Sequence, residues 1–147
     1  MEAKNLSATA QRTLAAWHDI LERNAMEELG PLLSERIVFR SPVAHRAYPG
    51  RTAICLALKT VNSVFQNFRY HRSFVSEDGT SVVLEFSASV EDKLLKGIDM
   101  LRFDDEGKIV EFEVMARPMS ALQALASEMG KRLAPFKAVL SGEATSG

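Results

Sequence analysis

The sequence is poor in several features that would each point to a class of protein. Its 147 residues include a single cysteine, Cys55, so no disulfide can form within the chain, as is usual in a reducing compartment. No apolar run approaches the length of a membrane span. The first residues, MEAKNLSATAQRT, lack the apolar core of a secretion signal. These absences lead us to expect a cytoplasmic protein that has no membrane partner.

The sequence also lacks an excess of charge of either sign. The net charge is −1, so no overall field would attract nucleic acid or an anionic surface. The sequence has no glycine-rich phosphate loop. The three histidines, His18, His45 and His71, do not have the spacing of metal ligands. We therefore expect no nucleic-acid partner, no metal and no other cofactor.

What remains is the composition of one globular domain. Apolar residues make up 46% and charged residues 25% of the chain, which is ordinary for such a domain. A length of 147 residues suits a single unit with its own core. No repeat or linker divides it, and only the small, polar residues 141–147 have the composition of a flexible tail.

Helical periodicity dominates the first half of the chain and returns near its end. Ser7 is suited to cap a first helix and Thr52 a third. The short second helix contains Pro31, which predicts that it is broken there. A last helix is predicted over residues 119–133. The apolar stripes that support these helices are Leu14, Trp17 and Leu21; Met26, Leu29, Leu32 and Leu33; Ile54, Leu58, Val61 and Phe65; and Leu122, either Leu125 or Ala126, Met129 and Leu133.

Alternation of apolar and polar residues predicts five strands, at residues 35–41, 67–76, 81–91, 93–103 and 108–117. Helices followed by a meander of long strands indicate an α+β fold, in which the three early helices cover one face of a mainly antiparallel sheet. The other face keeps apolar members, so we expect a second copy of the chain to cover it, as a homodimer. Those members are Val83, Ile98, Met100 and Met115.

Three segments resemble a known family: LAAWHDILERN, FRSPVAHRAYPGRTAI and, most specifically, GIDMLRFDDEGKIVEF. Over roughly residues 8–117 the chain resembles the SnoaL-like branch of the nuclear-transport-factor-2-like (NTF2-like) superfamily, whose fold is also called cystatin-like. The resemblance implies a cone-shaped barrel, in which helices lie against a strongly curved sheet and enclose an apolar pocket. It also implies pairing of two chains through the sheet.

The hairpin segment is especially similar to that of the ketosteroid isomerases, and the resemblance can be followed residue by residue. Their base, an aspartate before a proline, corresponds to Ser41. Their tyrosine on the first helix corresponds to Trp17, and their second, protonated aspartate is retained as Asp99. A serine cannot by itself take and return a carbon-bound proton. We therefore do not expect a standard ketosteroid isomerase.

Asp99 is unusual even without the resemblance, because it shares the alternation of Leu101 and Phe103. Burial of a carboxyl group in an apolar cavity raises its pKa. The neutral acid can then donate a hydrogen bond to a ligand oxygen, as it does in ketosteroid isomerase. The alternatives are a structural hydrogen-bond partner, or a register shift that turns Asp99 outward.

Other candidates have equally plain alternatives. His45, in the loop at the expected pocket mouth, is the best remaining base, although a loop histidine is more often only solvated. Trp17 either donates to a ligand or packs in the core, and Ser41 either orients a ligand or caps its strand. His18 and His71 are expected to face away. The residues predicted to line the pocket are Trp17, Phe39, Ser41, Tyr48, Tyr70, Phe86, Asp99, Phe112 and Val114.

The function predicted from these residues is binding of a small hydrophobic molecule that carries a carbonyl or hydroxyl oxygen. The alternative is an enzyme of isomerase, cyclase or dehydratase type, in which His45 or a bound water replaces the missing base.

Overall fold

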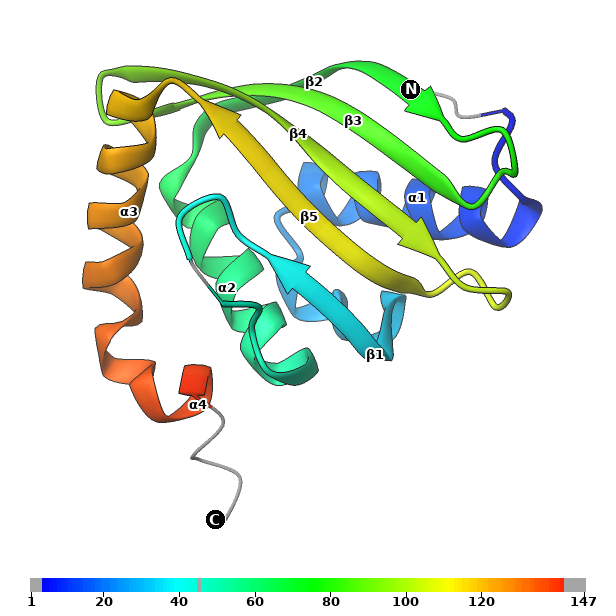
Figure 1. Cartoon of the computed structure of the whole chain (residues 1–147), viewed down its shortest axis with the longest axis horizontal. Coiled ribbons are helices and arrows are strands. Elements are labelled where there is room, and N and C mark those ends of the chain that lie inside the picture. Colours follow the sequence, from blue (N-terminus) through cyan, green and yellow to red (C-terminus); the bar gives the residue numbers. More distant parts are fainter. Residues whose placement is uncertain (1–3, 45, 142–147) are drawn as a thin grey trace.

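A computed structural model describes residues 4–44 and 46–141 of the chain (Figure 1). The predicted α+β fold is confirmed: the described residues form helices packed on a curved five-stranded sheet, and more helices follow its last strand. His45 and residues 142–147 of the predicted tail (141–147) lie outside the described residues. The helices are α1 (Ala8–Arg23), α2 (Gly50–Val64), α3 (Met119–Leu133) and α4 (Lys137–Ser141), and the strands are β1 (Leu33–Arg40), β2 (Gln66–Val75), β3 (Ser81–Val90), β4 (Lys93–Phe103) and β5 (Ile109–Arg117).

The strands lie in the order β1-β5-β4-β3-β2. Neighbours are antiparallel except for β1, which joins β5 in parallel and so closes one edge of the sheet with the first strand of the chain. Helices α1 and α2 cover the same face of the sheet, and α1 and α3 stand at opposite ends of the molecule (Figure 1). No helix in the described part of the chain is long and apolar enough to cross a membrane.

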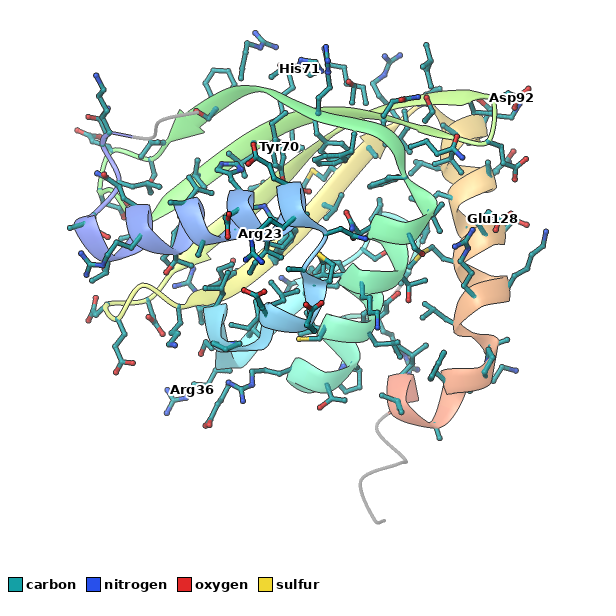
Figure 2. The ribbon with its side chains drawn as sticks, turned by 180° about the vertical axis from the view of Figure 1, so that it is seen from behind. Arg23, Arg36, Tyr70, His71, Asp92 and Glu128 are labelled. Carbon is teal, nitrogen blue, oxygen red and sulfur yellow. The ribbon has the colours of Figure 1, made fainter. Side chains whose placement is uncertain are left out.

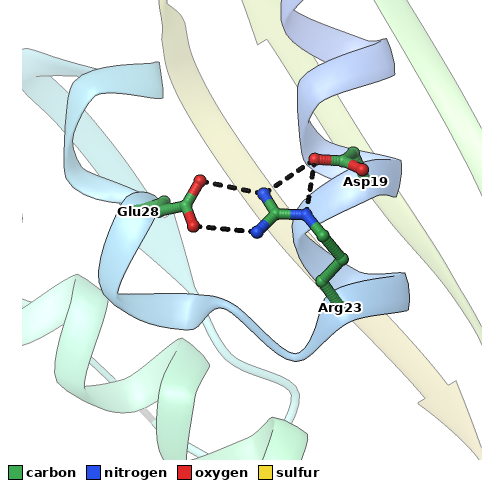
Figure 3. Close-up of polar contacts among 3 residues, drawn as sticks. All are labelled: Asp19, Arg23 and Glu28. Atoms are coloured by element: carbon green, nitrogen blue, oxygen red, sulfur yellow. Dashed lines mark hydrogen bonds and ion pairs between the residues drawn. The ribbon is translucent and has the colours of Figure 1, made fainter.

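The second predicted helix is instead a pair of 3₁₀ turns, η1 (Met26–Glu28) and η2 (Gly30–Leu32). A proline in η2 prevents a continuous α-helix because it has no backbone N–H to donate. Figure 3 shows how Arg23, at the end of α1, holds η1 in place. Its guanidinium contacts Asp19 at 2.7 Å and Glu28 at 2.8 Å. These ion pairs fix the turn that presents the buried Met26 to the interior.

Of the two predicted helix caps, one is confirmed and one is wrong. Ser7 caps α1 as expected, since its hydroxyl accepts a hydrogen bond from the Ala10 backbone at 3.3 Å. The prediction that Thr52 caps α2 is wrong, because the helix already begins at Gly50, directly after Pro49.

Strand β2 departs from simple alternation. The alternation of Phe68, Tyr70, Arg72 and Phe74 predicted one inward face, but the pairing with β3 shifts between Tyr70 and Ser73. Beyond this irregularity the two faces of the strand exchange. Arg72 therefore lies on the outer face, where its guanidinium binds both carboxylate oxygens of Glu85, at 2.8 and 2.7 Å. The sequence left two alternatives for Arg72, that it reaches the pocket opening or that it marks where the strand leaves the core, and the second agrees with its outer position.

The interior consists of two hydrophobic clusters. The first joins α1, α2 and β1 to the sheet, and it includes Trp17, Ile54 and Phe112. The second lies under α3 and includes Phe86 and Leu125. The space between these clusters is where the candidate site lies.

Candidate functional site

A chain of two hydrogen bonds joins three elements inside the molecule. The indole Nε1 of Trp17, on α1, donates to the hydroxyl oxygen of Tyr70, on β2, over 3.0 Å. The Tyr70 hydroxyl in turn donates to Oδ2 of Asp99, on β4, over 2.5 Å. In Figure 2, Tyr70 lies between α1 and the sheet. Trp17 therefore does not reach Asp99 directly, because Tyr70 stands between them.

Burial governs the protonation of this chain. Asp99 is only 5% exposed, and burial raises the pKa of its carboxyl to about 7, against the lowering effect of the hydrogen bond from Tyr70. Burial and the neighbouring carboxylate raise the pKa of Tyr70 well above its ordinary value. Near neutral pH, Tyr70 therefore stays protonated, while Asp99 is present in both charge states.

The two oxygens of the Asp99 carboxyl differ in their hydrogen bonds. Tyr70 bonds Oδ2, whereas no donor among the described residues bonds Oδ1. Asp99 also lines a pocket that is open to solvent at its mouth. The pocket wall therefore includes a buried carboxyl group.

The pocket lies between the two core clusters and is almost entirely apolar. Eight of the nine side chains predicted to line it do so: Trp17, Phe39, Ser41, Tyr48, Tyr70, Asp99, Phe112 and Val114. The ninth, Phe86, lies in the second cluster, where its ring covers Gly97 of the neighbouring strand. A Cβ on Gly97 would come within 2.7 Å of that ring.

The edge of the pocket near the end of β1 carries a second, weaker polar group. Ser41 accepts a hydrogen bond from the Val43 backbone at 3.1 Å, which is the strand-end role that the sequence left open for it. Burial raises the pKa of Tyr48, and a hydrogen bond with Ser41 partly offsets this rise. Neither residue is a base at neutral pH.

Of the two histidines that the structure describes, one faces outward and the other packs against Tyr70. His71 faces outward as predicted, and its ring nitrogen pairs with the Ser87 hydroxyl at 2.7 Å. The prediction that His18 faces solvent is wrong. Its ring packs edge-on against Tyr70, with centroids 5.3 Å apart, and burial lowers its pKa. Its Nε2 is buried without a hydrogen-bond partner among the described residues.

Metal binding finds no support in the described residues, which contain no cluster of His, Cys, Asp or Glu able to hold an ion.

Comparison with known proteins gives the family. The SnoaL-like domain family matches residues 14–112, a segment that contains Trp17, Ser41, Tyr70 and Asp99. The chain belongs to the SnoaL-like family.

Solved structures agree with this membership. The SnoaL-like chain is 56% identical to a steroid delta-isomerase from Pseudomonas aeruginosa, over 90% of this chain and 97% of the other, with a TM-score of 0.87. It is 28% identical to an uncharacterised cystatin-like protein from Silicibacter pomeroyi, over 88% and 90% of the two chains, with a TM-score of 0.80. An NTF2-like protein of unknown function from Mesorhizobium loti shares the fold, at 19% identity, 76% and 93% coverage and a TM-score of 0.66. No curated protein matches the chain.

Part of the pocket of this SnoaL-like protein lies beyond the segment that matches the family. Leu125 and Met129 of α3 line the pocket, and sequence reasoning missed both. The apolar stripe of 119–133 showed that this helix has a buried side. It contained no signal for what that side packs against, because the partner surface is assembled from α2 and the sheet.

Proposed function

We propose that this SnoaL-like protein binds a small, uncharged, hydrophobic molecule through one carbonyl or hydroxyl oxygen. The observation that carries the proposal is a buried carboxyl, Asp99, which lines an apolar pocket while Tyr70 bonds its Oδ2. A polar group buried in such surroundings costs free energy unless it is paired. A ligand oxygen completes the pairing.

The hydrogen bonds already present orient the carboxyl group toward the ligand. Trp17 donates to Tyr70, and Tyr70 donates to Oδ2 of Asp99. Oδ2 is thereby an acceptor, so the proton of the neutral acid resides on Oδ1, where it can be donated to a carbonyl. When Asp99 is ionised, Oδ1 can accept from a hydroxyl group instead.

The lining also restricts the charge of the ligand. None of the described side chains that line the pocket belongs to Lys, Arg or His. A carboxylate or phosphate would be buried there without a counter-charge, at a large cost. The name of the relative from Pseudomonas aeruginosa makes an uncharged steroid ketone a suitable first probe.

A second candidate function is an enzyme of isomerase, cyclase or dehydratase type. The pKa of Asp99, about 7, favours it because such a carboxyl can exchange a proton at neutral pH. Ser41, at the position of the isomerase base, argues against a standard isomerisation. We therefore expect that the protein does not convert a β,γ-unsaturated steroid ketone to its conjugated isomer. The ultraviolet absorbance of the conjugated product measures this conversion. Conversion that is lost in Asp99→Asn would establish the enzyme instead.

The binding function can be measured without a label, because Trp17 is the only tryptophan of the chain and lines the pocket. Its fluorescence reports occupancy by androst-4-ene-3,17-dione. We expect Asp99→Leu to weaken binding by roughly tenfold or more, as the loss of a buried hydrogen bond does. Asp99→Asn should lose less, since its amide keeps a donor. Equal losses in both variants, or none, would contradict the proposed role of Asp99.

We also propose that two copies of the chain associate through the outer sheet face. Met100 is 38% and Met115 47% exposed on that face, and they flank the less exposed Ile98. Exposed apolar side chains grouped on one surface favour association.

A further inference from the structure

The pocket has two chemically different ends. Trp17 and Leu21 of α1 line one part of it, and Leu125 and Met129 of α3 line another. Figures 1 and 2 show these two helices at opposite ends of the molecule, with α2 between them. The hydrogen-bonded chain from Trp17 to Asp99 belongs to the α1 side. Apolar residues of the second cluster, among them Phe65 and Phe68, line the pocket together with the α3 side chains.

We propose that Leu125 and Met129 of α3 set the maximum length of the molecule that the pocket accepts. This inference rests on the proposed function, because a ligand held by its oxygen at Asp99 must extend its apolar body toward α3. The specificity of the site would then be determined by a helix outside residues 14–112, the segment that matches the family. The accepted class is a neutral ketone or alcohol with a single apolar extension of limited length.

The α3 wall is held firmly enough to act as a limit. Leu125 is 2% and Met129 7% exposed, and both belong to the buried stripe of α3. At the lower part of the helix, Arg132 donates to the Ser63 hydroxyl of α2 at 3.1 Å and to Glu128 at 3.4 Å. The contact with Ser63 joins α3 to α2, and the contact with Glu128 lies within α3. A longer ligand must therefore displace packed side chains, which costs free energy.

A series of 4-alkylcyclohexanones, from methyl to octyl, tests the limit. Each member has the same carbonyl, and Trp17 fluorescence reports binding. In the natural protein, affinity should rise about fourfold with each methylene that is buried, and it should stop rising where the chain meets α3. In Met129→Ala this break should move to a chain roughly two or three carbons longer. In Met129→Phe it should move to a shorter chain.

Leu133→Ala is the matched control. Leu133 lies on the same stripe, one turn further on, with the same 7% exposure, and it does not line the pocket. Leu133→Ala should lose about as much stability as Met129→Ala. It should not change the chain length at which affinity stops rising. Each variant is first shown to unfold cooperatively; if Met129→Ala does not, Leu125→Val replaces it, with the same expected lengthening.

The outcomes separate the two proposals. A break that stays at one chain length in all Leu125 and Met129 variants overturns the role of α3 and leaves the proposed binding at Asp99 intact. A break that moves equally in Leu133→Ala overturns it as well. Failure of every ketone to bind the natural protein overturns the proposed function and, with it, this inference.

Discussion

Asp99 should make the stability of this protein fall as pH rises from about 4 to about 7. Its pKa is about 7 in the folded chain, against an ordinary value of 3.8. Below pH 3.8 the acid is neutral in both states and costs nothing. Between these values the unfolded chain releases the proton that the folded chain retains, so stability declines. Above pH 7 the full cost, on the order of 4 kcal/mol, is present.

Urea unfolding between pH 4.5 and 8.5 measures this decline. The side chain of Asp99→Asn cannot ionise, so this variant should lose most of the decline. Its stability relative to the natural protein should therefore increase as pH rises. Asp92→Asn, in the exposed turn before β4, should leave the decline unchanged. Parallel pH profiles for the natural protein and Asp99→Asn would show that the carboxyl is ionised in the folded state throughout.

Tyr70 is the residue on which the polar chain depends. Tyr70→Phe removes the acceptor of Trp17 and the donor to Asp99 together. We expect a loss of about 2 kcal/mol in the free energy of unfolding near pH 6, because two buried groups lose their partner. The pKa of Asp99 should also rise, since the Tyr70 hydrogen bond lowers it. NMR titration of the Asp99 carboxyl measures the second effect.

Tyr48→Phe is the comparison for this prediction. It removes a half-buried hydroxyl from the same pocket, but one that does not touch Asp99. Its effect on the pKa of Asp99 should be small. A Tyr70→Phe variant that titrates like Tyr48→Phe would mean that the Tyr70–Asp99 hydrogen bond is absent in solution.

Single residues were predictable where strand alternation decides their orientation. Alternation placed Phe39, Asp99 and Phe112 on the inner face without knowledge of any partner. It could not pair Tyr70 with Asp99, because they are 29 residues apart and meet only through the arrangement of β2 against β3 and β4. The prediction that His18 faces solvent was wrong for a similar reason. The side of α1 next to Trp17 is covered by β2, which comes much later in the chain.

At the scale of elements, the backbone of β4 is closely packed at Gly97. A Cβ there would lie 2.5 Å from the Met115 carbonyl oxygen and 2.7 Å from the Phe86 ring. Gly97→Ala should therefore destabilise the protein by about 2 kcal/mol or more, because a backbone atom must move. Urea unfolding at pH 6 measures the change.

Gly130 of α3 provides the opposite case. An added Cβ meets nothing within 4 Å, and alanine favours a helix more than glycine does. Gly130→Ala should stabilise the protein by up to about 1 kcal/mol. Equal effects of the two substitutions would contradict the packing described at Gly97.

The elements themselves were predicted well where periodicity is long and regular. Helix α3 runs over residues 119–133, as its apolar stripe indicates. The faces of β2 were not predictable beyond Tyr70, since the shift in pairing depends on β3 and leaves no local pattern. The two 3₁₀ turns were predicted only in part. Pro31 indicated a break in the second helix, but periodicity cannot distinguish a short helix from two tight turns.

At the scale of the whole molecule, the outer sheet face can be tested for association. If two copies meet there, Met100→Glu should shift the chain from dimer to monomer in analytical ultracentrifugation, because a buried charge would lack a partner. Met119→Glu, on α3 rather than on the sheet, is the matched change at an exposed methionine. It should leave the sedimentation unchanged. A natural protein that sediments as a monomer at every concentration would end this proposal.

The parallel pairing of β1 with β5 has a consequence for the order in which the protein can form during synthesis. Leu33 is paired with Ile109, and Phe39 with Phe112, so β1 waits for more than 70 further residues before its partner exists. Contacts so distant along the chain close slowly. While the ribosome adds β2 to β4, the apolar sides of α1 and α2 have no completed sheet to cover them. We therefore expect the nascent chain to need chaperones most before residue 117 has emerged.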